Sequence, residues 1–95
     1  MSPAEIKERL AELNPEALLA DGFDEALVGI VRQFNRYLAL YDYERCIEEL
    51  MDNMATSHES DSQLELSAIE YFEFNVVGAW MGENTPCFTV LSLEE

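Results

Sequence analysis

Carboxylates make up most of the side chains in this sequence that could take part in chemistry. The chain of 95 residues has 20 Asp and Glu but one His and two Cys. Nucleophilic catalysis needs a base beside the nucleophile, and the single histidine, His58, lies in the polar run "TSHESDS", where we expect an exposed loop. Hydrolysis by paired carboxylates stays open, but the acids lie on predicted solvent faces, whereas a raised pKa needs burial. We therefore predict that the protein is not an enzyme.

The sequence predicts no metal site and no cofactor. Glu59, Asp61 and Glu65 offer oxygen ligands, but a calcium loop of the EF-hand kind needs alternating ligands and a central glycine, which this stretch lacks. Cys46 and Cys87 have no C-x-x-C spacing and lie beside apolar neighbours. This pattern favours two buried, reduced thiols, and a disulfide between them is the open alternative.

The charge of the chain is large and unevenly distributed. The net charge is −15, all five basic residues lie at or before Arg45, and the chain from Cys46 onward has eleven acids and no Lys or Arg. Such a surface repels nucleic acid and anionic membranes, and it attracts basic partners over roughly 8–10 Å. We therefore predict a basic protein surface as partner, that of a nucleic-acid-binding protein or complex, with no direct binding of nucleic acid or membrane.

The elements that must position these acids are expected to form one compact α+β domain over residues 1–95. It is mainly helical, with four to five helices and a minimal two-stranded sheet. A capping box begins the first helix at Ser2, and the predicted protein is soluble and cytoplasmic because no apolar run approaches the roughly 20 residues of a membrane span. Further helices are predicted at 16–20, 24–34, 43–54 and 64–80, paired strands at 37–41 and 87–91, and a polar flexible loop at 56–62.

Helix 43–54 is expected to separate its apolar and acidic residues onto opposite faces. Cys46, Ile47 and Leu50 fall in one sector of a wheel of 100° per residue, and the acids fall in the opposite sector. Like charges at this spacing destabilise a helix slightly, so they indicate either a binding face or simply a solvated one. The predicted partner-binding residues, which include two acids of helix 64–80, are Glu44, Glu48, Glu49, Asp52, Glu70 and Glu73.

Helix 64–80 carries apolar residues on almost all sides. Ala68 and Phe72 share one side, whereas Tyr71 and Phe74 lie on the other. A helix of this kind is normally central and packed on more than one face. We therefore expect this stretch to be core, with Phe72 and Trp80 buried.

Three stretches of the chain resemble a loosely defined set of small acidic proteins from bacteriophages, prophages and their hosts. They are "LADGFDEALVGIV" (19–31), "ALYDYERCIEEL" (39–50) and "AIEYFEFNVVGAW-GE-TP" (68–86), and the last combines aromatic, glycine and proline positions that periodicity alone does not produce. Residues 55–67 depart from the pattern through a longer connection. The resemblance implies a phage-type setting in a bacterial host cell and carries no catalytic residue.

These observations together predict a non-enzymatic, acidic, protein-binding inhibitor. Rows of surface carboxylates can present the charge density of a phosphate backbone to a protein that binds DNA or RNA, and phages use small acidic proteins against host nucleases and defence complexes. The leading hypothesis is a nucleic-acid mimic that blocks a host defence nuclease of the restriction or CRISPR type. The alternative is a phage or host accessory or assembly protein that binds a basic partner without inhibiting it.

Overall fold

The computed structural model of the chain describes residues 1–54, 61–79 and 81–89. Three α-helices lie in this part of the chain: α1 (Pro3–Leu13), α2 (Tyr43–Met54) and α3 (Asp61–Phe72). A 3₁₀ turn, η1 (Asp24–Ala26), follows α1 at a distance, and a π-helical segment, η2 (Glu73–Val77), directly continues α3. The class is α+β, as expected, but the prediction of four to five helices is wrong. No helix in the described part of the chain is long and apolar enough to cross a membrane.

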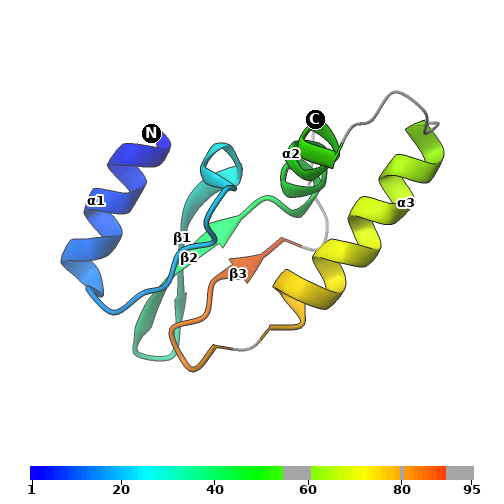
Figure 1. The fold of residues 1–95 in the computed structure, drawn as a ribbon. Helices are drawn as coiled ribbons and strands as arrows, with labels where there is room; N and C mark the ends of the chain where they lie inside the picture. The colour runs from blue at the N-terminus through cyan, green and yellow to red at the C-terminus, as the bar shows by residue number, and fades with distance from the viewer. Residues whose placement is uncertain (55–60, 80, 90–95) are drawn as a thin grey trace.

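The sheet has three strands and not the predicted two, because residues 27–33 form an additional strand at one of its edges. The strands are, in spatial order, β1 (Leu27–Gln33), β2 (Arg36–Tyr41) and β3 (Cys87–Phe88). β1 and β2 form an antiparallel hairpin, and β3 runs parallel to the end of β2, with Leu40 opposite Cys87. The predicted pairing of 37–41 with 87–91 is therefore present at these positions. In Figure 1 the sheet lies between α1 on one side and the pair α2 and α3 on the other.

Residues 24–34 fold as η1 and β1 instead of the predicted helix. The apolar positions of this segment fit helical spacing, which misled the prediction. Ile30 and Val31 are β-branched and favour a strand, while Gly29 costs about 1 kcal/mol in a helix interior. Pairing with β2 decides the competition, because it places Ile30 opposite Ala39 at the core.

Residues 16–20 do not form the predicted helix either: Glu16 lies in a turn, and the residues after it have no regular secondary structure. Their backbone groups find partners outside any helix. The amide of Leu18 donates to the carbonyl of Asn84 at 3.0 Å, and the amide of Ala20 donates to the hydroxyl of Tyr41 at 2.8 Å. These two bonds tie the segment to the turn before β3 and to the end of β2.

The predicted capping box of α1 is confirmed. Ser2 Oγ accepts from the amide of Glu5, and the carboxylate of Glu5 accepts from the amide of Ser2. The helix then places Ile6 and Leu10 in the core. Buried residues from α1, α2, α3, the hairpin and the segment around η1 meet there, and they are Ile6, Leu10, Phe23, Ala26, Leu27, Ala39, Tyr41, Cys46, Ile47, Leu50, Ala68 and Phe72.

The predicted helix 64–80 starts earlier and ends earlier than expected. α3 begins at Asp61, so Asp61 and Ser62 belong to a helix and not to the predicted polar loop, while 55–60 and Trp80 lie outside the described residues. Ala68 and Phe72 are fully buried, as predicted. The prediction that this helix packs on more than one face is wrong, because the face of α3 and η2 opposite Phe72 is exposed.

The β1–β2 hairpin turns through Phe34 and Asn35 with an unusual backbone at the first position. Phe34 has a φ of 56°, and it is the one non-glycine residue with positive φ among those described. A left-handed backbone costs an L-residue roughly 1–2 kcal/mol, and the Phe34 side chain is 89% exposed. The turn therefore carries local strain that no burial of this side chain offsets.

Replacing Phe34 by Gly should therefore raise the free energy of unfolding by about 0.5–1 kcal/mol. Glycine adopts the backbone without strain, and its greater freedom in the unfolded chain cancels part of the gain. Urea denaturation checks this, with Asn35→Gly as the control, because Asn35 has an ordinary negative φ and should gain nothing. Equal stability of the Phe34→Gly variant and the wild type would contradict the strain.

Candidate protein-binding surface

A groove of about 500 Å³ between α2 and α3 brings carboxylates of both helices together. Glu44 and Glu48 come from α2 and Glu65 comes from α3, and all three are exposed. The apolar side chains that line the same groove are buried or half-buried and form its floor. We call this site the acidic groove, and its lining residues are Tyr43, Glu44, Ile47, Glu48, Met51, Glu65 and Ile69.

The sequence of α2 explains why two of these acids stand at the rim. The carboxylate of Asp42 accepts a hydrogen bond from the amide of Glu44 at 3.1 Å and fixes the start of the helix. Burial of Cys46 and Leu50 then sets the rotation of the helix. Glu44 and Glu48, one turn apart, consequently lie beside the buried face.

Glu65 completes the groove, and sequence reasoning considered it only as a calcium ligand. It precedes Ile69 by one turn of α3, and Ile69 is half-buried against the core. Residues four apart share a helix face, so Glu65 must stand beside the α2–α3 contact. The spacing of Glu65 and Ile69 is visible in the sequence, but the packing of this face of α3 against α2 is not.

The structure does not bring all the predicted partner-binding acids of α2 together. Glu49 is half-buried and lies toward η1, and its Oε1 atom is buried without a hydrogen-bond partner among the described residues. Burial raises the pKa of Glu49, and the nearby carboxylate of Glu25 raises it further. Asp52 is exposed but does not line the acidic groove. Glu49 is thus separated from the exposed row of acids on α2.

The two predicted acids of helix 64–80 have different surroundings, because Glu70 lies in α3 and Glu73 lies in η2. Glu73 Oε2 accepts a hydrogen bond of 2.5 Å from the hydroxyl of Tyr43, which joins η2 to the start of α2. Burial raises the pKa of Tyr43 to about 12, and the bond to Glu73 contributes to the shift. Glu70 is exposed, and it shares a shallow depression with Glu73, Tyr71 and Phe74.

Among the residues that the structure describes, no positive side chain lines the acidic groove. The ion pairs of the described residues lie elsewhere and join Lys7 to Asp24, Arg9 to Glu12 and Arg36 to Glu83. The carboxylates of the groove repel one another because like charges do so. A cationic partner bound between them would reduce this repulsion.

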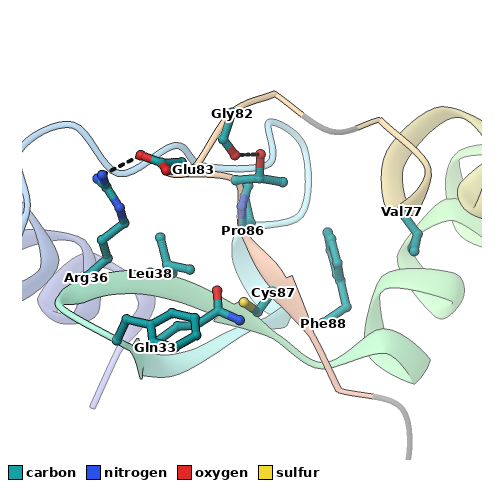
Figure 2. Close-up of a pocket in the computed structure, with 11 residues that line it drawn as sticks. Gln33, Arg36, Leu38, Val77, Gly82, Glu83, Pro86, Cys87 and Phe88 are labelled. Atoms are coloured by element: carbon teal, nitrogen blue, oxygen red, sulfur yellow. Dashed lines mark hydrogen bonds and ion pairs between the residues drawn. The ribbon is translucent and has the colours of Figure 1, made fainter.

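A second cavity, of about 490 Å³, is lined by residues of β2 and β3 (Figure 2). Arg36 and Glu83 form an ion pair at one end of it, and Val77 of η2 lies at the other end. Cys87 and Thr85 are the possible nucleophiles that line it. Burial raises the pKa of the Cys87 thiol, the Thr85 hydroxyl donates to the carbonyl of Gly82, and among the described residues the one carboxylate in the lining is the paired Glu83. This arrangement therefore offers no activated nucleophile.

Both cysteines are free thiols in the structure. Cys46 is fully buried, as predicted, and burial raises its pKa to about 12. Cys87 is half-buried. Among residues 1–54, 61–79 and 81–89, no three Asp, Glu, His or Cys side chains are grouped to hold a metal ion.

Comparison of the chain with models of protein families gives no match, and neither does comparison with curated proteins or with solved structures.

Proposed function

We propose that the protein is a non-enzymatic inhibitor that binds a basic, nucleic-acid-binding protein through the acidic groove and competes with its nucleic acid. The observation that carries the proposal is the meeting of Glu44, Glu48 and Glu65 from two helices in one groove that no cation of the described part of the chain lines. The partner proposed is a host defence nuclease of the restriction or CRISPR type, in the cytoplasm of a bacterial cell. The resemblance of the sequence to small acidic phage proteins supports this class.

The spacing of the carboxylates supports competition with a phosphate backbone. The rise of 1.5 Å per residue separates Glu44 from Glu48 by about 6 Å along the axis of α2. Each strand of DNA carries one charge per about 3.4 Å. Glu65, facing the α2 row from α3, raises the charge density of the groove toward that of a nucleic-acid strand.

The apolar floor of the groove suits the long cationic side chains of such a partner. Lys and Arg bury their methylene stems along apolar surface while the charged head remains near water. Ile47 and Met51 offer that surface directly beside Glu44 and Glu48. A bound Lys or Arg would thus gain both a carboxylate and a hydrophobic contact.

The test is a variant that removes the groove charges and leaves its floor intact. The triple change Glu44→Gln, Glu48→Gln and Glu65→Gln should release a nuclease that co-purifies with the tagged wild-type protein from bacterial lysate. The loss of binding with salt, between about 0.05 and 0.2 M, should also become less steep, because fewer charged contacts remain to be screened. Excess duplex DNA should displace the wild-type protein, and the captured nuclease should be inactive until this happens.

A matched control distinguishes the effect of the groove charges on binding from the effect of the total net charge. Glu8→Gln, Glu12→Gln and Glu16→Gln removes the same three charges from exposed positions in and just after α1. This variant should bind nearly as well as the wild type. Equal loss of binding in both triple variants would show that only total charge matters, and binding without inhibition would make the protein an accessory or assembly factor.

A further inference from the structure

We propose that the exposed aromatic face of α3 and η2 is a second contact for the basic partner, and that it receives a segment with an apolar anchor flanked by Lys or Arg. This inference rests on the proposed function, because it takes the same kind of partner. The face, called here the aromatic patch, consists of Ile69, Glu70, Tyr71, Glu73 and Phe74.

Two large aromatic side chains of the patch are left in solvent by the fold. Phe74 is 83% exposed and Tyr71 is 50% exposed, whereas their neighbour Phe72 is fully buried on the opposite side. Both line one depression of the surface together with Ile69. Exposed apolar side chains that cluster in this way typically mark interaction sites, whereas single ones need no explanation.

The backbone of η2 holds Phe74 in this outward position. Ala68, Phe72 and Val76 face the core at a spacing of four residues. In an α-helix of 3.6 residues per turn, positions at this spacing rotate around the axis by about 40° per step. The wider π turn removes this rotation and packs Val76 against the core. The amide of Gly78 closes the turn by donating to the carbonyl of Glu73 at 2.9 Å.

The charge of the patch selects its occupant. Glu70 and Glu73 line the same depression as the two aromatic rings, and no Lys or Arg lines it. Cations are attracted to carboxylates and also to the faces of aromatic rings. An apolar side chain between Lys or Arg residues matches both parts of this surface.

The same charges disfavour the other occupants. A second copy of the chain would bring its own Glu70 and Glu73 against these carboxylates in a symmetric contact, and like charges facing each other across an interface are unfavourable. Duplex nucleic acid and anionic lipid are repelled by a chain of net charge −15.

Two synthetic peptides serve as defined probes for the patch. One has a Leu-Phe pair flanked on both sides by Lys, and the other has the same charge but Ser in place of both apolar residues. Backbone amide shifts of the full-length protein, followed by NMR during titration, should move over residues 69–75 with the first peptide. Its affinity should exceed that of the second peptide by about tenfold or more, and duplex DNA should cause no shifts.

Phe74→Asn and Phe34→Asn form a matched pair of variants, because both remove a highly exposed Phe. Phe74→Asn should reduce the affinity for the Leu-Phe peptide to that of the Ser peptide, and Phe34→Asn should leave it unchanged. Far-UV circular dichroism should show both variants folded. Equal affinity of the two peptides, equal effects of the two variants, or shifts confined to the acidic groove would each overturn the inference. The peptide titration does not measure nuclease binding by the groove variant, so a failure of this inference can be distinguished from a failure of the proposed function.

Discussion

Replacing Phe72 by Ala is expected to lower the free energy of unfolding by about 3–5 kcal/mol, the usual range for a buried Phe. Phe72 is fully buried, and its ring makes edge-to-face contacts with three other rings. The distance between ring centroids is 5.3 Å to Phe23 and to Phe88, and 5.5 Å to Tyr43. These partners belong to three separate parts of the chain. A domain of this size has about 5–14 kcal/mol in total, so the loss removes a large part of its stability.

Urea denaturation measures this loss directly. The control is Phe74→Ala, which deletes the same atoms from a side chain that is 83% exposed. Its effect should stay within about 0.5 kcal/mol, as for other surface positions. If the two variants unfolded at the same urea concentration, Phe72 would not be the centre of the core.

Gly78→Ala is expected to lower the free energy of unfolding by about 1 kcal/mol or more. An added Cβ would lie 2.9 Å from the carbonyl oxygen of Glu73 and 3.3 Å from that of Phe74. Both atoms belong to the backbone, so relieving the overlap requires the π turn to open. Overpacking of this kind costs about 1–3 kcal/mol, which outweighs the gain of up to about 1 kcal/mol from the better helix propensity of Ala.

Gly29→Ala is the control for this prediction, because nothing lies within 4 Å of a Cβ added at Gly29. This change should be neutral or slightly stabilising. Amide shifts should move in η2 of the Gly78→Ala variant, where the orientation of Phe74 changes. Equal stability of the two variants, without shifts in η2, would mean that the turn accommodates a side chain at no cost.

The elements that the sequence predicted correctly are those with local signals. Ser2 and Glu5 specify the start of α1, and the separation of apolar and acidic residues specifies α2. β1 was missed because the spacing of its apolar residues fits a helix and a strand alike, and only pairing with β2 distinguishes them. Likewise, the four-residue repeat through Phe72 is compatible with a plain helix, and the wider turn follows from packing that the sequence does not display.

The acidic groove was predictable in part for the same reason. The helical wheel of α2 correctly predicts that Glu44 and Glu48 share its exposed acidic face. Glu49 lies at the edge of that face and near η1, whose position depends on the tertiary fold. Glu65 could be found only by knowing that Ile69 faces α2. Residues of a site that come from one helix are visible in a sequence, but those contributed by a second helix depend on how the two pack.

The parallel pairing of β3 with the central strand has a consequence for the order of folding. The β1–β2 hairpin and the α2–α3 pair each join segments that are close in the chain. The pairing of Leu40 with Cys87 instead closes a loop of about half the length of the chain. Closing this longer loop has the larger entropic cost. Local contacts are therefore expected to form first and β3 to dock late. In this order of events the acidic groove forms before the ring of Phe72 meets that of Phe88, so the charged surface is expected to precede the complete core.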